Sequence, residues 1–258
     1  AYIGWRLTSY GQVADVLNTV ADALQRAADW LEASELTGGG WGYTESVGAD
    51  ADSTSLGILF LQAMGRRVPE TALQRLLSFH RDDGGFGTYS YEQSFGAWTS
   101  SQVEITAIAA LALQAAGMAP DTVTRATTFL RQHQRADGLW DSYWWTSTYY
   151  ATEVAVRLLG ESVRPDALAA LQTTCPLNSF DLALKSLILR DTTEPLEKAQ
   201  TTNGSWSSKP MLLIPRLDIY TPPALNCTRP CFADPCCLFT TATALGALIH
   251  SDTGVTKK

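Results

Sequence analysis

The sequence predicts an all-α protein in which helix pairs repeat along the chain and close into a ring. A unit recurs: an outer helix, a glycine–aromatic turn, a polar loop, and a second helix rich in small residues. The apolar residues of these segments keep helical spacing. The small side chains of the second helices allow close packing, as expected for the inner helices of a ring. We therefore expect a single domain over residues 1–258.

The outer helices are predicted from their first residues. Pro69, Pro120 and Pro165 are each followed by Glu or Asp and then by a helical pattern. Proline at a helix start needs no N–H partner, and an acid suits the positive end of the helix dipole. An amphipathic helix over residues 13–33 precedes the first turn.

A glycine-rich turn with an aromatic residue follows each outer helix. Asp-Gly and Asn-Gly favour turns because glycine accepts positive φ. The turns lie at Gly38–Gly42, Asp82–Gly87, Ala136–Trp140 and Asn203–Trp206. The regular return of the aromatic residue indicates a repeated structural role.

The inner helices can be overlaid by the glycine that ends each one. Asp52 and Glu104 then fall at equivalent places near two helix starts. Ser147 and Phe239 fall at the same place in two further units. Because a ring brings all inner-helix starts to one end, we expect these four residues around a single mouth.

Composition excludes several classes of function. The net charge is -7 and no block of Lys or Arg occurs, which argues against nucleic acid as a partner. No run of about 20 apolar residues occurs, so no transmembrane segment is expected. The first residues lack the features of a signal peptide. Five cysteines, an odd number crowded near the C-terminus, favour a reducing, cytoplasmic location over a disulfide framework.

The stretch GGWGYTESVGADADSTSLGILFLQAMG at Gly39–Gly65 resembles the D-x-D-D-T-A region of class II terpene cyclases. The glycine–aromatic turns resemble the QW-type repeats of squalene–hopene cyclases and protein prenyltransferase β-subunits. The resemblance implies an α/α toroid of about six helix pairs. It also implies that Asp52 is the general acid and that Asp50 supports it. Ser53 stands where that motif has its last Asp.

Such a site protonates an alkene, which requires a carboxyl group that stays protonated. A solvated Asp has a pKa of about 3.9, and burial or a neighbouring carboxylate raises it. Glu104 is a candidate second acid near the rim. No metal and no cofactor are needed. An apolar, isoprenoid substrate fits this chemistry, and a partner domain or chain could complete the cavity.

Aromatic side chains are expected to line the cavity, since their π faces stabilise a cation by roughly 0.5–2 kcal/mol each. The candidates are Trp41, Tyr43, Phe86, Tyr89, Trp98, Trp140, Trp144, Trp145, Tyr149, Tyr150 and Phe239. The turn aromatics among them also suit structural packing of the repeat, and Asp50 and Asp52 also suit plain helix caps.

The residues leave two alternative functions open. One is a non-catalytic toroid that binds a ligand or peptide. The other is a zinc-dependent, prenyltransferase-like enzyme, because Asp234-Pro-Cys236 has the form of zinc ligands in that family. However, His250 is badly placed to complete such a site, and the spacing of Cys227, Cys231 and Cys236 matches no standard zinc pattern. The proline-rich segment 209–227 is expected to cross the surface or the mouth. Arg216 on it suits either an anionic substrate group or a surface ion pair.

Overall fold

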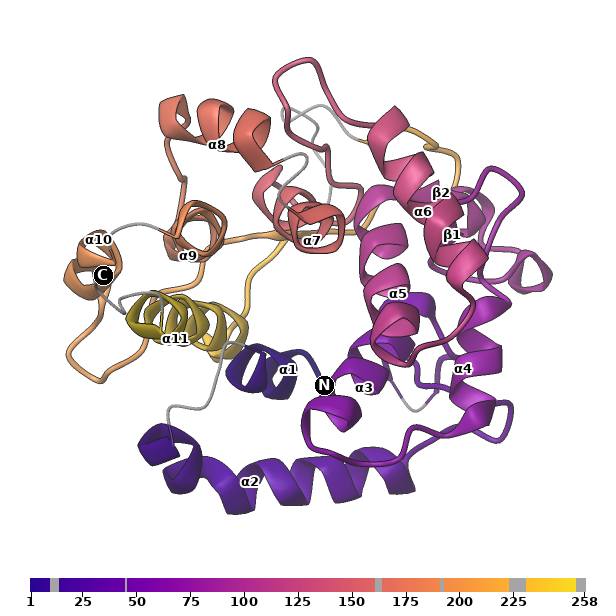
Figure 1. Ribbon diagram of the computed structural model, residues 1–258, viewed down its shortest axis with the longest axis horizontal. Helices are drawn as coiled ribbons and strands as arrows, with labels where there is room; N and C mark the ends of the chain where they lie inside the picture. Colours follow the sequence, from indigo (N-terminus) through magenta and orange to yellow (C-terminus); the bar gives the residue numbers. More distant parts are fainter. Residues whose placement is uncertain (10–13, 45, 161–163, 191–192, 223–230, 254–258) are drawn as a thin grey trace.

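The inner helices form a closed ring in the computed structural model (Figure 1). Along the ring, α3 packs on α5, α5 on α7, α7 on α9 and α9 on α11, and α1 lies between α11 and α3. These helices are α1 (Tyr2–Thr8), α3 (Ala51–Ala63), α5 (Val103–Ala115), α7 (Tyr149–Leu159), α9 (Ser179–Leu189) and α11 (Leu238–Thr253). The structure describes residues 1–9, 14–44, 46–160, 164–190, 193–222 and 231–253.

A second layer of helices surrounds this ring (Figure 1). It consists of α2 (Ala14–Ala33), α4 (Glu70–Leu77), α6 (Pro120–Gln132), α8 (Arg164–Thr173) and α10 (Glu194–Ala199). The predicted α/α toroid is thus confirmed. One element was not predicted: α1 precedes the first repeat, yet it closes the ring as an inner helix.

A recurring junction ties each glycine–aromatic turn to an inner helix. A threonine in the first turn or two of the helix accepts a hydrogen bond from the backbone N–H of the turn aromatic. The pairs are Thr54 with Trp41 (3.1 Å), Thr106 with Phe86 (2.8 Å), Thr152 with Trp140 (3.2 Å) and Thr241 with Trp206 (3.2 Å). The same hydrogen bond recurs in four units, so the four threonines show which residues of the inner helices are equivalent.

The aromatic rings of these junctions lie between the inner and outer helices. The indole Nε1 of Trp41, Trp140 and Trp206 donates to a leucine carbonyl near the end of the preceding outer helix, at 2.7–2.8 Å. Trp41 also packs on Gly57 of α3, where an added Cβ would lie 2.6 Å from the indole. Close packing on a small residue and a satisfied indole N–H fix each helix pair.

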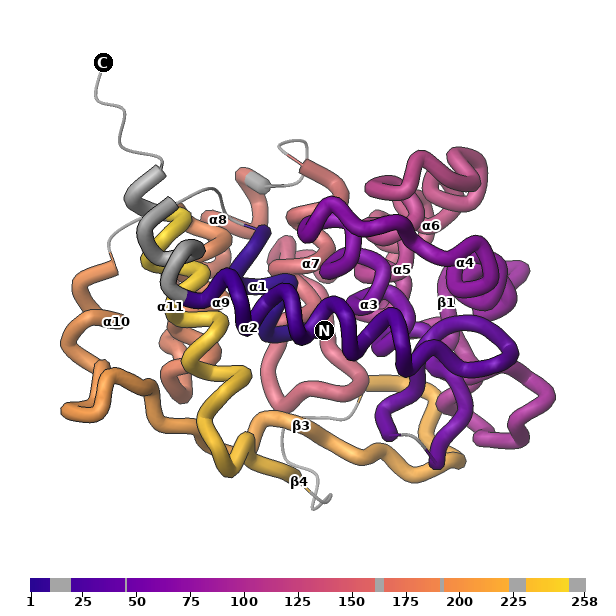
Figure 2. The backbone as a smooth tube through the Cα atoms, turned by 90° about the horizontal axis from the view of Figure 1, so that it is seen from below, coloured from indigo at the N-terminus to yellow at the C-terminus, as the bar shows by residue number. Residues whose placement is uncertain are grey.

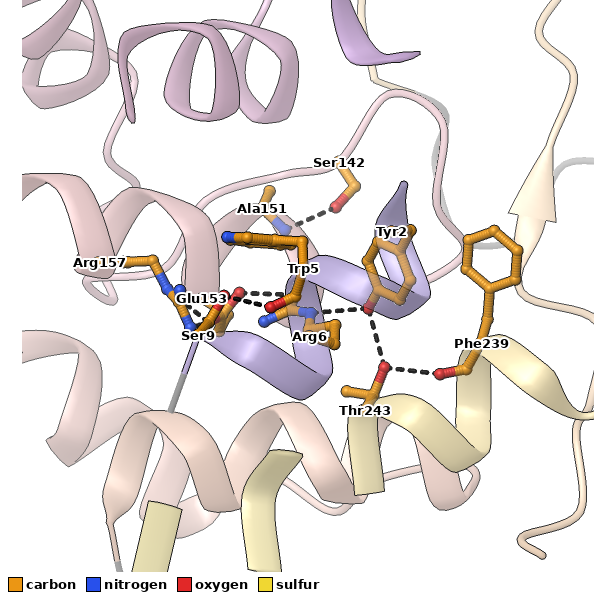
Figure 3. Close-up of polar contacts among 10 residues, drawn as sticks. All are labelled: Tyr2, Trp5, Arg6, Ser9, Ser142, Ala151, Glu153, Arg157, Phe239 and Thr243. Atoms are coloured by element: carbon orange, nitrogen blue, oxygen red, sulfur yellow. Dashed lines mark hydrogen bonds and ion pairs between the residues drawn. The ribbon is translucent and has the colours of Figure 1, made fainter. Parts of the chain in front are cut away.

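Helix α1 is held by buried polar contacts with α7 and α11 (Figure 3). Arg6 is fully buried and pairs with Glu153 Oε2 at 2.8 Å. Its Nε donates to the Tyr2 hydroxyl at 3.0 Å, which lies 2.8 Å from the Thr243 hydroxyl. One short helix is thereby linked to its ring neighbour α11 and also to α7.

A proline-containing segment crosses the end of the ring where the inner helices begin (Figure 2). It contains β3 (Leu212–Leu213), which pairs with β4 (Cys231–Phe232), while β1 (Phe86–Gly87) pairs with β2 (Ser101–Gln102). Leu213 N–H donates to the Trp144 carbonyl at 2.7 Å. The segment therefore crosses the mouth as expected, although residues 223–230 lie outside the described part of the chain.

Candidate active site

The threonine junctions define which inner-helix residues are equivalent at the mouth. The residue two positions before each threonine is Asp52 on α3, Glu104 on α5, Tyr150 on α7 and Phe239 on α11. The expectation for Ser147 is wrong, because α7 runs directly into Gly160 and is shorter than α3 and α5. Counting 13 residues back from Gly160, as for the other two helices, therefore gives Ser147 instead of the equivalent residue, Tyr150.

Asp50 is the N-cap of α3. Its Oδ1 accepts from Ser53 N–H at 2.7 Å, and its Oδ2 accepts from the Ser53 hydroxyl at 2.9 Å. Burial raises the pKa of Asp50 to about 6, although these hydrogen bonds oppose the shift. Ser53, which occupies the place of the last motif Asp, thus stabilises the carboxylate form of Asp50.

Asp52 lies one residue into α3 and is partly buried. Burial raises the pKa of its carboxyl to about 8, and the charges of Asp50 and then Glu104 contribute in the same direction. None of the described residues offsets this shift with a hydrogen bond to the Asp52 carboxylate. The two Asp residues therefore differ: Asp50 caps the helix, whereas Asp52 holds a proton at neutral pH.

Glu104 is buried at the start of α5, with 1% of its surface exposed. Its Oε1 accepts the backbone N–H groups of Tyr143 and Trp144, both at 2.7 Å. Its Oε2 is buried without a hydrogen-bond partner among the described residues. Burial raises the pKa of Glu104 to about 7 despite the two amide bonds. The structure therefore brings the predicted second acid close enough for its charge to act on Asp52.

Two tyrosines lie beside the acids. Burial, followed by the charges of Asp50 and Asp52, raises the pKa of Tyr89 to about 12. Burial and the charge of Asp52 also raise the pKa of Tyr150. The Tyr150 hydroxyl is buried and has no hydrogen-bond partner among the described residues. Both phenols are therefore neutral neighbours of the carboxyl of Asp52.

Aromatic rings form two groups around this point. In one, Tyr89, Phe95 and Trp98 contact one another, and Trp98 lies 5.1 Å from Trp144. In the other, Trp145 stacks on Tyr150 at 4.3 Å and on Phe180 at 5.2 Å, and Tyr2 stacks on Phe239 at 4.7 Å. Trp98, Trp144, Trp145 and Phe239 keep accessible surface. Phe95, Phe180 and Tyr2 were not among the predicted candidates.

Other predicted aromatic residues lie elsewhere. Trp41, Phe86 and Trp140 are buried in the hydrophobic core at the helix junctions, so they serve packing. Tyr43 is 75% exposed in the loop before α3. The Tyr149 hydroxyl donates to the Thr174 hydroxyl at 3.1 Å, just after the end of α8. Sequence periodicity cannot separate a ring that packs the repeat from one that faces the mouth.

Those residues with the form of zinc ligands that the structure describes form no metal-binding group. Asp234 Oδ2 instead accepts the Phe239 N–H at 2.6 Å and so caps α11. Cys231 and Cys236 are exposed, and Cys227 lies outside the described residues. Within the described ranges, no group of three or more His, Cys, Asp or Glu side chains is arranged to hold a metal. Asp234 is therefore explained as a helix cap.

Arg216 on the crossing segment is exposed and forms a two-pronged ion pair with Asp218, at 2.8 and 3.0 Å. This confirms the surface ion pair among the two roles considered for it. In the part of the chain that the structure describes, no helix has the length and apolar character needed to span a membrane.

The chain is similar in sequence to several known proteins. Residues 60–160 match the family of the squalene-hopene cyclase C-terminal domain. The chain is 28% identical over 191 residues to the drimenyl diphosphate synthase of Streptantibioticus cattleyicolor, covering 71% of this chain and 32% of the relative. It is 32% identical over 154 residues to that of Streptomyces showdoensis, covering 55% and 28%. The chain thus spans about a third of the length of these curated relatives.

Solved structures share the fold over nearly the whole chain. The type II terpene cyclase MstE from Scytonema superposes with a TM-score of 0.79 at 23% identity, over 96% of this chain and 85% of that one. A variant of that cyclase was solved with its product, merosterolic acid A, and another with its substrate, geranylgeranyl dihydroxybenzoate. The ent-copalyl diphosphate synthase from Streptomyces platensis matches with a TM-score of 0.68 at 20% identity, over 97% and 50%. The chain therefore resembles the class II terpene cyclases, and it has the α/α-toroid fold of these structures.

Proposed function

We propose that this protein cyclises an isoprenoid or a similar apolar chain, and that Asp52 starts the reaction by protonating an alkene or epoxide. One observation carries the proposal: at the start of α3, burial raises the pKa of the Asp52 carboxyl to about 8, and the charges of Asp50 and Glu104 act in the same direction. A general acid works best when it is protonated near the operating pH. The relatives that act on isoprenoids support the choice of substrate class.

The proton that Asp52 gives to the substrate is replaced at the end of the reaction. The π electrons of the alkene form a C–H bond to the Asp52 proton, and the O–H electron pair stays on Asp52 as a carboxylate. The cation on the more substituted carbon is then attacked by the next alkene of the chain, which forms a ring. Loss of a proton from carbon ends the reaction and leaves an alkene. Solvent protonates Asp52 again, so no cofactor is consumed.

The aromatic groups beside Asp52 suit the cationic steps. Trp98 and Trp144 on one side, and Trp145 and Phe239 on the other, keep accessible surface. Each ring face stabilises a nearby cation by roughly 0.5–2 kcal/mol and offers no lone pair that would trap it. Glu104 lies one inner helix away, and its charge helps to keep the proton on Asp52.

We further propose that a partner domain or chain covers the mouth during the reaction. Several large apolar side chains are exposed on the segments there: Ile214, Leu217, Tyr220, Phe232 and Leu238. The chain also matches only about a third of the length of its curated relatives. Covering this surface would exclude water. Because water reacts with a carbocation, its exclusion would let the cation live long enough to cyclise.

The proposal is tested by turnover of the purified chain with farnesyl and geranylgeranyl diphosphates, geranylgeraniol and squalene. Products are separated and identified by gas chromatography with mass spectrometry. Asp52→Asn is expected to lower kcat by about 10²- to 10⁴-fold while the chain stays folded. Asp121→Asn, an exposed acid in the first turn of α6, is the matched control and keeps wild-type kcat.

Two outcomes would overturn this function. One is wild-type turnover by Asp52→Asn. The other is a wild-type chain that binds these compounds in calorimetry but converts none of them, which would favour the non-catalytic, ligand-binding toroid.

A further inference from the structure

The loop between β1 and β2 carries one of the two aromatic groups. Its Tyr89, Phe95 and Trp98 have ring centroids 4.6–6.0 Å apart. The loop also contacts the start of α3, because the Thr88 carbonyl accepts the Ala51 N–H at 2.9 Å. Apart from two short 3₁₀ turns, at Tyr91–Gln93 and Gly96–Thr99, this loop has no regular structure to fix its shape.

Arg81 binds both ends of this loop from inside the protein. It lies after α4 and is only 4% exposed. Its Nε donates to the Thr99 carbonyl at 2.7 Å, and its Nη2 donates to the Tyr89 carbonyl at 2.5 Å. Its guanidinium also lies over the Tyr91 ring, 4.1 Å from the centroid. The planar fork of arginine holds two acceptors in a fixed relation, which a flexible ammonium does not do.

Gly87 leaves the space that the Arg81 side chain occupies. A Cβ added to Gly87 would lie 2.8 Å from Arg81 Nη2 and 2.3 Å from the Thr99 carbonyl oxygen. Only glycine therefore allows the guanidinium and the loop backbone to meet there. A buried cation that binds backbone carbonyls instead of serving as a surface ion is costly to desolvate, which indicates a specific role.

Gln102 completes the attachment at the same two ends. Its Oε1 accepts from the Thr88 N–H at 3.1 Å and from the Thr88 hydroxyl at 2.9 Å, while its Nε2 donates to the Ala97 carbonyl at 3.2 Å. The Thr88 hydroxyl in turn accepts from Trp144 Nε1 at 2.9 Å. The backbone of Trp144 binds Glu104. The loop is thus connected to an acid and to an aromatic residue of the next repeat.

We propose that Arg81 is a positioning residue for the cyclisation: it fixes the loop so that Tyr89, Phe95 and Trp98 form a rigid aromatic wall beside Asp52. This rests on the function proposed above. The wall shields the cation from water. When it loosens, a water oxygen forms a C–O bond with the cation and loses a proton, giving an alcohol instead of the alkene. Arg81 therefore determines which product forms, whereas Asp52 determines whether any product forms.

The test compares Arg81→Lys, Arg81→Ala and Arg125→Lys with the wild type on whichever isoprenoid the wild type converts. Arg125 is the matched control, because it is exposed on α6 and binds the Asp82 carbonyl of the adjoining turn from outside. For each variant the unfolding midpoint, kcat, KM and the ratio of alcohol and partly cyclised products to the wild-type product are measured. Products formed in D₂O are checked for deuterium.

For Arg81→Lys we expect kcat to fall by about ten- to a hundredfold and the ratio of aberrant products to rise several-fold. Deuterium is still incorporated, because Asp52 is intact. In Arg81→Ala, added methylguanidinium is expected to restore the product ratio in a saturable way, whereas urea is not. Arg125→Lys keeps the wild-type ratio.

The proposal is overturned if both Arg81 variants unfold at lower temperature but give the wild-type product ratio in their folded fraction. If Arg81→Ala does not fold, an unchanged ratio in Arg81→Lys is sufficient to reject it. Failure of the underlying function gives a different result, since Asp52→Asn would then retain turnover.

Discussion

At the scale of single residues, hydrogen bonding distinguishes three carboxyl groups that the sequence presents as similar. Burial raises the pKa of Asp50 only to about 6 and that of Glu104 only to about 7, because each accepts backbone N–H bonds that favour the carboxylate and oppose the shift. Asp52 receives no such bond from the described residues, and its pKa is raised to about 8. The environment therefore assigns the proton to Asp52.

A stability measurement distinguishes this acid from a helix cap. The folded-state pKa of Asp52, about 8, lies above its unfolded value, so its contribution to stability is lost as pH rises through about 8. Asp52→Asn has no such loss. We expect it to raise the free energy of unfolding in urea by about 1–2 kcal/mol at pH 9 and to have less effect at pH 5. Lower stability at both pH values would instead indicate a capping role.

The pH profile of turnover tests the coupling between the two Asp residues. The charge of Asp50 raises the pKa of Asp52, so removing it favours the Asp52 carboxylate. Asp50→Asn is expected to shift the alkaline limb of kcat/KM to lower pH, while asparagine still caps α3. A shift to higher pH, or a profile like that of the wild type, contradicts this coupling.

At the scale of elements, the repeat was predictable, but the direction of each aromatic ring was not. Proline starts, glycine turns and small-residue helices indicated the helix pairs correctly. The turn aromatics Trp41, Phe86 and Trp140 recur for packing, and their regularity alone gives no sign of which rings face the mouth. The place of Tyr150 was missed because α7 is shorter than the helices used to align it.

The threonine junction can be tested on α7. Thr152→Val removes the acceptor of the buried Trp140 N–H. An unpaired buried N–H costs about 1–3 kcal/mol, so urea unfolding should show a loss of that size. Thr128→Val on the exposed side of α6 is the control, expected within about 0.5 kcal/mol of the wild type. Equal effects of the two substitutions would show that the junction adds no stability.

At the scale of the whole molecule, closure of the ring depends on an element outside the repeat. Helix α1 has no turn, proline start or terminal glycine of the kind that marks the other helices, so no repeat pattern identifies it in advance. The same holds for Arg6 and Arg81, whose partners are distant in sequence or are backbone carbonyls. Long-range pairing of this kind is visible only in the folded chain.

The contribution of α1 to closure can be measured. Arg6→Met leaves Glu153 buried on α7 with its ion pair to Arg6 removed, although Arg157 still lies 3.3 Å from Glu153. Loss of one partner of a buried pair costs about 3 kcal/mol, which urea unfolding should detect. A change below about 1 kcal/mol would mean that α1 is held by its apolar contacts alone.

The most direct test of the account is the source of the proton that starts the reaction. The wild-type chain is incubated in D₂O with the isoprenoid that it converts, and the product is analysed by mass spectrometry and NMR. The account predicts one deuterium per product molecule, at the carbon that Asp52 protonates, and a rate of product formation about 10²- to 10⁴-fold lower for Asp52→Asn. A cyclised product without deuterium, or one that forms equally well with Asp52→Asn, would contradict it.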